Sequence, residues 1–351
     1  MKILFIGKSS KPVSGWGRMS FLLINEFKRR EYEVKDINED NKLLPLSKWN
    51  LFKNILIIRR GARDCDVIHA LDGWPYGIYG YLAVIFSKRK FFINGVGTYS
   101  VAPFNNFLKG IILKIVYRRA DKIFCISKYT EKRILEKVKL KNTEVVYLGN
   151  TNTLSQDINN EIKLDENCFP KLLTIGEVKY RKGHLYVLEA VKLLKNKYPN
   201  ISYCIAGVFS DLEYLNRIKK YILDNDLNNN VVLLGSVNND EQLVSLYRWC
   251  DIFLLCSIVT KNYFEGFGLV LIEAASFGKP VIGSFDNGTE EAVKNQCNGY
   301  LVKQKDSLDI YEKVLKILNG DLEKMSQYSR LWASEFSWEK TVNEYIKFYK
   351  E

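Results

Sequence analysis

The chain has 351 residues, of which 47% are hydrophobic and 26% charged, so it is long enough for two domains and apolar enough to bury a core in each. This composition excludes intrinsic disorder, a collagen helix and a coiled coil. The net charge of +12 arises in residues 1–155, which carry 28 Lys and Arg against 13 Asp and Glu, and this excess favours an anionic partner: nucleic acid, a membrane face or a phosphorylated substrate.

In chain order, short β-branched and aromatic runs alternate with longer amphipathic stretches, a pattern typical of βαβ units and of parallel sheets covered by helices. The strands expected in the first half are 2–6, 33–37, 67–70, 91–94, 122–127 and 144–148. A polar segment, 150–167, is interpreted as the interdomain linker. The strands expected in the second half are 171–176, 201–207, 230–235, 251–256, 280–284 and 300–302, and three helices follow them. The pattern predicts an α/β protein with two doubly wound domains, 1–155 and 168–330, facing each other across a cleft.

A glycine-containing loop follows the first strand, and Gly15, Gly17 and Arg18 stand just before the first predicted helix. Glycines let a chain approach a phosphate, and the amides of a helix N-terminus can bind it. Because Asp36 lies 21 residues after Gly15 at a strand end, a dinucleotide-binding fold for NAD is an alternative. The loop from Gly7 to Gly15 argues against it, since that fold needs a tight turn.

Two glutamates in the second half form the most informative pattern. Glu265 lies in the loop after the strand 251–256, and Glu273 lies inside a helix that begins near Gly268 and is otherwise apolar. A buried carboxylate needs hydrogen-bond donors, which a ribose diol supplies; the alternative donor is a lysine of the same chain. Gly266 and Gly268 allow close approach, and the amides from Gly268 to Val270 can hold a phosphate.

The segment E-G-F-G-L that closes on G-K-P-V-I, within 264–284, resembles glycosyltransferase family 4, a large group of retaining enzymes with the GT-B fold. The resemblance covers nearly the whole chain and includes the segments 175–183, 233–257, 298–302 and 336–345. It implies two Rossmann-like domains, a C-terminal helix over 331–351 that packs back on the N-terminal domain, and a nucleotide-sugar donor, either a UDP-sugar or a GDP-sugar.

The resemblance also implies roles for individual residues. Glu273 would bind the ribose, Glu265 would lie beside the donor sugar hydroxyls, and Lys182, with the adjacent Arg181, would neutralise the leaving diphosphate. Glu177 stands where the family usually has an arginine, so Arg181 or Lys179 would replace that cation. Further donor contacts are expected from Gly15, Gly17, Gly235, Val237, Ser257, Gly266, Phe267, Gly268, Leu269 and Val270.

The acceptor side carries three candidates. Val96 occupies the position where the family usually has a histidine, and a departing phosphate can then accept the acceptor's proton. His69, at the end of the strand 67–70, and Asp72, in the loop after it, lie where cleft residues occur in α/β sheets, although a buried structural histidine and a turn aspartate are the alternatives. The D-C-D at 64–66 is interpreted as a strand entry, so no essential metal and no cofactor are expected.

Two basic, aromatic-containing segments, 46–63 and 104–122, complete the pattern. Helices of this kind can lie in a lipid interface and are attracted to anionic head groups, and the alternative is that their apolar side is core. No apolar run is long enough to span a membrane or to form a secretory signal, and the seven cysteines form no C-x-x-C pair. These features predict a cytoplasmic protein bound peripherally to the inner face of the plasma membrane.

Together the motifs predict a retaining glycosyltransferase that moves a sugar from a nucleoside diphosphate donor to a glycan or glycolipid acceptor, lipid-linked or polysaccharide, at the cytoplasmic membrane face. Two alternatives remain: an NAD-dependent oxidoreductase, and a non-catalytic module that binds membrane or nucleic acid. A nucleic-acid partner is not expected, because the sequence contains no helix-turn-helix, RNP-type or zinc module.

Overall fold

The computed structural model describes residues 1–11, 15–45, 48–150, 162, 164–237, 239–261, 263–320 and 322–351. It divides into two compact units, which we call unit 1 (Met1–Gly149 with Ser337–Glu351) and unit 2 (Asn150–Phe336). Most of the segment interpreted as a linker, and parts of the predicted glycine loop and of the first basic segment, lie outside the described residues. No helix in the described part of the chain has the length and apolar content needed to cross a bilayer.

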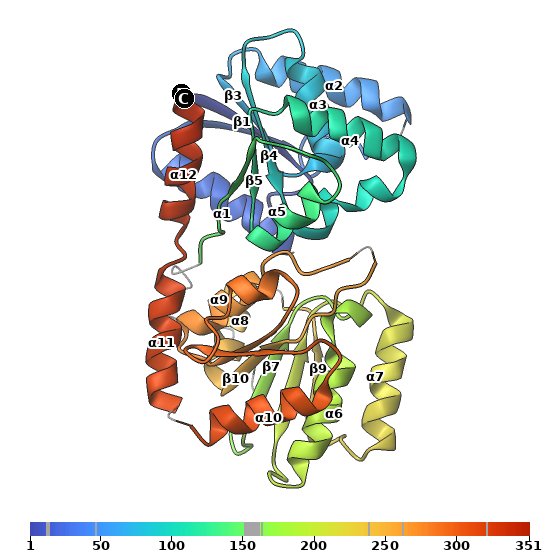
Figure 1. The fold of residues 1–351 in the computed structure, drawn as a ribbon, viewed down its shortest axis with the longest axis vertical. Coiled ribbons are helices and arrows are strands. Elements are labelled where there is room, and N and C mark those ends of the chain that lie inside the picture. Colours follow the sequence, from blue (N-terminus) through green and yellow to red (C-terminus); the bar gives the residue numbers. More distant parts are fainter. Residues whose placement is uncertain are drawn as a thin grey trace. The chain divides into compact units, whose positions relative to one another are not determined.

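Unit 1 is built on a six-stranded parallel sheet in the order β2-β1-β3-β4-β5-β6 (Figure 1). Its strands are β1 (Lys2–Gly7), β2 (Glu33–Asn38), β3 (Val67–Ala70), β4 (Lys90–Gly95), β5 (Lys122–Cys125) and β6 (Thr143–Val145). Central strands such as β1 and β3 are apolar along almost their whole length because helices cover both faces of the sheet. The predicted strands of the first half are confirmed.

The helices of unit 1 are α1 (Gly15–Arg29), α2 (Lys48–Ala62), α3 (Ile78–Val84), α4 (Phe107–Arg119), α5 (Lys128–Leu135) and α12 (Trp338–Lys350). Gly15 and Gly17 lie in the first turn of α1, so the expectation that they precede the helix is wrong. Gly17 and Met19 already belong to the buried face that continues through Leu23 and Phe27, and this packing extends the helix toward its N-terminus.

The C-terminal helix α12 is part of unit 1, while α11 (Leu322–Ser334) belongs to unit 2. Tyr345 and Tyr349 of α12 are buried in the core of unit 1. The ring of Tyr345 stacks on Phe124 with centroids 4.4 Å apart, and the ring of Tyr349 stacks on Phe27 at 5.7 Å. The last helix therefore returns to the N-terminal unit as predicted, but it begins at Trp338, and residues 331–334 of the predicted segment 331–351 belong to α11 of unit 2.

Unit 2 contains a second six-stranded parallel sheet, in the order β12-β11-β10-β7-β8-β9. Its strands are β7 (Lys171–Ile175), β8 (Ser202–Ala206), β9 (Val231–Gly235), β10 (Ile252–Leu255), β11 (Val281–Ser284) and β12 (Gly299–Val302). Its other helices are α6 (His184–Lys195), α7 (Leu212–Asp224), α8 (Asp240–Trp249), α9 (Leu269–Ser276) and α10 (Ser307–Leu318). The second set of predicted strands is also confirmed.

The strand order of unit 2 reverses between β7 and β10. From β7 the chain adds β8 and β9 on one side, and then returns to pair β10 with the other side of β7. In open α/β sheets, ligands bind at the carboxyl ends of the strands beside such a switch point. The loops after β7 and β10 are therefore the expected position of a site in unit 2.

Candidate functional site

The loop after β7 places two cations at the switch point. Arg181 and Lys182 lie in a short 3-10 turn, Tyr180–Lys182, which the amide of Ile258 ties to the loop after β10 by donating to the carbonyl of Arg181 at 2.7 Å. Gly183 follows with φ +75°, and a Cβ there would lie 2.0 Å from the carbonyl oxygen of Cys256. Only glycine fits this position, and the close contact between the two loops fixes the backbone position of the adjacent Lys182.

Glu265 lies between these two cations. Its Oε2 accepts a hydrogen bond from Lys182 Nζ at 2.5 Å and another from Arg181 Nη1 at 2.9 Å. The hydroxyl of Ser257 donates to the same oxygen at 3.4 Å. The structure thus brings together four residues that the sequence assigned to the donor site from two separate loops.

The neighbouring cations determine the protonation state of Glu265. Burial opposes ionisation of Glu265, but Lys182 and Arg181 outweigh it and lower the pKa of the carboxyl to about 2. Burial lowers the pKa of Lys182 as well, and the neighbouring Arg181 adds to this effect while Glu265 opposes it. Glu265 carries one negative charge and the two cations carry two positive charges, so the cluster retains one excess positive charge with which to bind an anion.

The segment 264–268 leads from this cluster into α9. Gly268 caps the helix in the left-handed region, with φ +83°, and leaves the first amides, on Leu269 and Val270, at the helix N-terminus. Phe267 anchors the segment in the core of unit 2, with its ring 5.5 Å from that of Phe336. The helix start near Gly268 is as predicted, and its amides are suited to a phosphate.

A brace that sequence reasoning missed holds this segment in place. The amide of Gly288, after β11, donates to the carbonyl of Glu265 at 3.0 Å, and Asn287 Nδ2 donates to the carbonyl of Ser257 at 3.3 Å. Asn287 is completely buried. The only sequence signal for this brace is the N-G-T at 287–289, which by itself predicts no more than a turn.

Glu273 lies in the interior of α9 with 2% of its surface exposed. Its Oε2 accepts a hydrogen bond from the hydroxyl of Tyr247 on α8 at 2.8 Å. A donor inside the protein therefore satisfies part of this carboxylate. That donor is a tyrosine, and not the lysine expected as the alternative to a ribose diol.

Three other positions singled out in the sequence, Gly235, Val237 and Glu177, lie at the ends of strands β9 and β7 or just after them, at the same edge of the sheet. The carbonyl of Gly235, at the end of β9, accepts from the amide of Gly207 at 2.6 Å, and Val237 follows two residues later. Glu177, at the position of the usual family arginine, pairs with Lys179 and accepts from the hydroxyl of Ser210 at 2.5 Å. Lys179 is thus paired with Glu177, whereas Arg181 joins Lys182 at Glu265.

In unit 1, three predicted positions share the carboxyl edge of the sheet: the start of α1 with Gly15 and Gly17, Asp72 after β3, and Val96 after β4. Trp16 and Tyr99 link the first and last of these loops, with ring centroids 5.6 Å apart. Asp72 is only 5% exposed, and burial raises its pKa well above the ordinary value against the opposing backbone amides of Trp74 and Tyr76. No described group forms a hydrogen bond with its Oδ1.

His69 lies away from that edge, inside the core of unit 1. Its Nδ1 contacts the hydroxyl of Tyr349, and its Nε2 contacts Asn94 Oδ1 at 2.8 Å. Burial lowers the pKa of the imidazole to about 3, so His69 is neutral at physiological pH. This placement favours the structural interpretation of His69 over a role at the acceptor.

Comparison with solved structures identifies the fold. The Anabaena protein HepE, solved in complex with UDP, is similar with a TM-score of 0.78 and 17% identity, covering 99% of each chain. Sucrose-phosphate synthase from Thermosynechococcus elongatus is similar with a TM-score of 0.78 and 18% identity, covering 100% of this chain and 98% of that one. These likenesses confirm the predicted GT-B fold.

Comparison of sequences identifies the family. An uncharacterised glycosyltransferase of Methanocaldococcus jannaschii is 28% identical over 87% of this chain and 80% of its own length. A capsular polysaccharide biosynthesis glycosyltransferase of Staphylococcus aureus is 26% identical over 78% of this chain and 75% of its own. Residues 156–332 match the family model described as glycosyl transferases group 1. The chain belongs to this family and is a glycosyltransferase.

Proposed function

We propose that the chain is a retaining glycosyltransferase of family 4 that takes a sugar from a nucleoside diphosphate donor bound by unit 2. The observation that carries this proposal is the cluster of Glu265, Arg181 and Lys182 at the switch point between β7 and β10. The similar protein HepE was solved with UDP bound, which supports a nucleotide sugar as the donor class here.

In this proposal the diphosphate replaces Glu265 as the partner of the two cations. The amides of Leu269 and Val270 at the start of α9 face the same anion, and the loop from Gly235 to Val237 lies against the base. Glu273, held by Tyr247, accepts from the ribose hydroxyls. Glu265, freed from the cations, then binds the hydroxyls of the donor sugar.

The reaction breaks the bond between the anomeric carbon and the diphosphate oxygen and forms a bond from the acceptor oxygen to the same face of the anomeric carbon. The departing phosphate oxygen takes the proton of the acceptor hydroxyl, so no histidine is needed at Val96. Lys182 and Arg181 stabilise the negative charge that develops on the diphosphate.

The proposed acceptor is a lipid-linked or polysaccharide glycan at the cytoplasmic face of a membrane. The names of two relatives support this class: one acts in capsular polysaccharide biosynthesis and another in amylovoran biosynthesis. The excess positive charge of the first 155 residues supports the membrane location.

The donor assignment is tested by titration calorimetry of UDP, GDP and pyrophosphate. Glu273→Gln should weaken binding of the preferred nucleotide by roughly 10- to 100-fold, because hydrogen bonds to a charged group are lost, and should leave pyrophosphate binding unchanged. Glu312→Gln, an exposed change on α10, is the control and should bind as the wild type does. Equal nucleotide binding by a folded Glu273→Gln protein would contradict the ribose role.

Tyr247→Phe tests how much of the nucleotide affinity depends on the hydrogen bond that positions Glu273, and how much on the charge of Glu273 itself. The variant keeps the carboxylate and removes only the hydroxyl that donates to it. We expect a loss of nucleotide affinity smaller than that of Glu273→Gln, since the ribose still meets an ionised carboxylate. A loss as large as that of Glu273→Gln would show that Tyr247, and not the ribose, accounts for the effect.

A further inference from the structure

Helices α2, α3 and α4 form one face of unit 1, with α3 packed between the other two (Figure 1). The inner side of α4 is buried through Gly110, Leu113, Val116 and Tyr117. The outer side of the same helix exposes Phe107 at 79% and Leu108 at 69% of their surface. The alternative that the apolar residues of this segment only build the core therefore does not account for its outer side.

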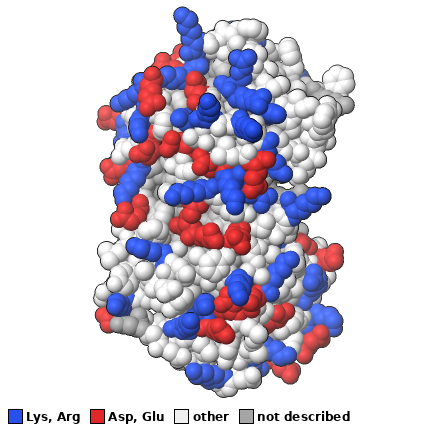
Figure 2. Space-filling view, viewed as in Figure 1, with Lys and Arg blue, Asp and Glu red and all other residues white. Residues whose placement is uncertain are grey.

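The exposed apolar residues continue across the three helices. Trp49 of α2 is 88% exposed and Phe52 is 68% exposed, and Phe86, two residues after α3, is 91% exposed. We call this set the docking face, and its members are Trp49, Phe52, Phe86, Phe107, Leu108, Ile111, Ile112 and Ile115. In Figure 2 the surface at the upper right, over these helices, contains few charged atoms. A set of this size on one face is typical of an interaction surface.

The charges of these helices are all of one sign. α2 and α4 contain four Lys or Arg each and no Asp or Glu, and α3 contains no charged residue. A second copy of the chain would oppose its own positive charge across such a face. An anionic lipid surface complements both the exposed apolar side chains and the cations at their border.

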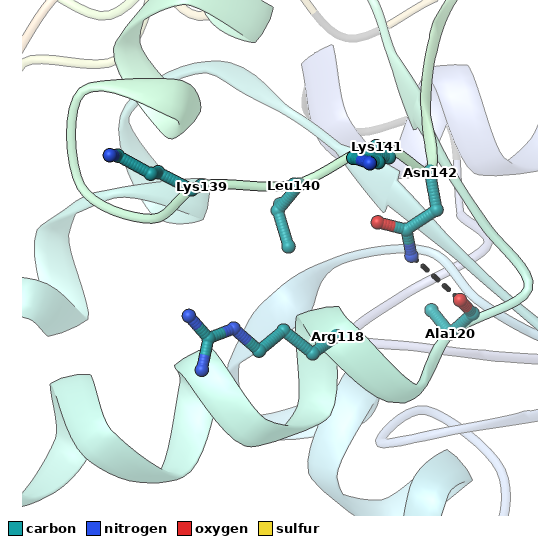
Figure 3. Close-up of a pocket in the computed structure, with 6 residues that line it drawn as sticks. All are labelled: Arg118, Ala120, Lys139, Leu140, Lys141 and Asn142. Atoms are coloured by element: carbon teal, nitrogen blue, oxygen red, sulfur yellow. Dashed lines mark hydrogen bonds between the residues drawn. The ribbon is translucent and has the colours of Figure 1, made fainter.

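A basic pocket lies at the end of the docking face. It has a volume of ≈ 250 Å³ and is lined by Arg118, Ala120, Lys139, Leu140, Lys141 and Asn142 (Figure 3). Arg118 lies three residues after Ile115, on the same exposed side of α4. Asn142 Nδ2 donates to the carbonyls of Ala120 at 2.6 Å and Tyr117 at 2.9 Å, which satisfies the C-terminal end of α4.

The three cations of the basic pocket form no ion pair with any described residue. Such a group of unpaired cations beside an apolar helix face matches the phosphate of a lipid head group whose acyl chains contact that face. We propose that the docking face lies in the interface of an anionic membrane and that the basic pocket binds the phosphate of a lipid head group. This deepens the proposed membrane location, on which it rests.

Sedimentation of the full chain with lipid vesicles tests the proposal. The wild type should bind vesicles of equimolar phosphatidylcholine and phosphatidylglycerol, should bind phosphatidylcholine alone far more weakly, and should lose affinity as salt is added. Absence of binding to the anionic vesicles would overturn the docking proposal and leave the nucleotide titrations, and with them the donor assignment, untouched.

The docking face is tested by a fourfold variant, Trp49→Ser, Phe52→Ser, Phe107→Ser and Leu108→Ser. We expect vesicle affinity to fall by about a hundredfold or more, because each substitution replaces a large apolar side chain that would lie in the lipid with a small polar one. The matched control carries the same number of similarly exposed changes in unit 2: Leu212→Ser, Leu223→Ser, Leu308→Ser and Leu331→Ser. Equal loss in both variants would overturn the assignment.

The basic pocket is tested by Arg118→Ala with Lys139→Ala and Lys141→Ala. Each cation near an anionic membrane contributes roughly fivefold to binding, so the triple variant should bind about a hundredfold more weakly. The control removes three exposed lysines of unit 2 and changes the net charge equally: Lys192→Ala, Lys219→Ala and Lys316→Ala. Equal losses would overturn the pocket as the head-group site.

Size-exclusion chromatography without vesicles separates the membrane from a second copy. The wild type and the fourfold variant should elute alike, because the docking face is not covered by protein in this proposal. A wild-type dimer that the fourfold variant dissociates would overturn the membrane assignment in favour of self-association.

Discussion

Glu265 holds the position that the proposed diphosphate would take. Both of its hydrogen-bonded cations approach the same oxygen, Oε2. A carboxylate in this place gives both partly buried cations a hydrogen-bonded counterion while no substrate is bound, since unpaired buried charge is costly. The same arrangement makes the carboxylate a competitor of the diphosphate for Arg181 and Lys182.

Replacing Glu265 with Gln should therefore destabilise the substrate-free protein at pH 7. The folded-state pKa of about 2 lies below the ordinary value of 4.5, so the unfolded chain takes up the proton first as the pH falls. The stabilisation, on the order of 3 kcal/mol, is complete above about pH 4.5 and is lost between that pH and about 2. Urea unfolding of both proteins at pH 7, 5 and 3 should show the difference shrinking only at the lowest pH.

The same variant separates binding from turnover. Glu265→Gln should bind the bare nucleotide diphosphate at least as tightly as the wild type, because the competing carboxylate is gone, while turnover of the nucleotide sugar falls. A variant that unfolds like the wild type at pH 7, or that loses nucleotide affinity, would contradict this description of Glu265.

At the scale of single elements, the geometry of the turn between β7 and α6 sets the position of the cations. Gly183 and Gly235 both lie in the left-handed region, with φ of +75° and +81°. They differ in their surroundings: a Cβ on Gly183 meets the Cys256 carbonyl at 2.0 Å, whereas a Cβ on Gly235 meets only the Phe209 ring at 3.9 Å. Alanine substitutions at the two glycines therefore distinguish the cost of backbone strain alone, at Gly235, from the cost of strain plus steric overlap, at Gly183.

Gly235→Ala should lower the free energy of unfolding by about 1 kcal/mol, the cost of the backbone conformation alone. Gly183→Ala should lower it by several kcal/mol, roughly 3 or more, because the loop must also move away from β10. Thermal unfolding of both variants measures the difference. Equal midpoints would contradict the close approach of the two loops.

The sequence predicts elements well where one local pattern decides them. All strands but one appear within two residues of their predicted bounds because parallel strands buried on both faces are short continuous apolar runs. The exception is β6, which ends at Val145, three residues before its predicted end. The start of α1 at Gly15 was missed, since two glycines weaken any helical pattern and only the packing of Gly17 extends the helix.

Contacts between distant segments could not be predicted in the same way. Lys182 meets Glu265 across 83 residues, and Tyr247 meets Glu273 across 26, so no spacing rule identifies either partner. The outer side of α4 was equally undecided, because a helix that is apolar on both sides gives no period from which to choose the buried one. Family membership, and not the motifs alone, excludes the NAD-dependent oxidoreductase and the non-catalytic module.

At the scale of the whole molecule, unit 1 is built from two segments that lie at opposite ends of the chain. Unit 1 is completed by the last residues of the chain, which follow all of unit 2. Tyr349 of α12 contacts His69, and the hydroxyl of Tyr345 donates to Asn94 at 3.0 Å, so polar groups in the core of unit 1 depend on α12. Every residue to which the proposed function assigns donor binding lies in unit 2, within Asn150–Phe336, whereas the expected donor contacts Gly15 and Gly17 lie in unit 1.

A chain that ends at Phe336 should therefore lose unit 1 and keep unit 2. Removing two buried tyrosines alone costs about 6 to 10 kcal/mol, which approaches the whole stability of a domain. Hydrogen exchange should become fast in β1, β3 and β4 and stay slow in β7 and β10, and the truncated chain should still bind the nucleotide under the proposed function. Tyr349→Phe, which keeps the ring and removes only the hydroxyl at His69, is the control and should retain slow exchange in both sheets. Slow exchange of β1 and β3 in the truncated chain would mean that unit 1 folds without α12.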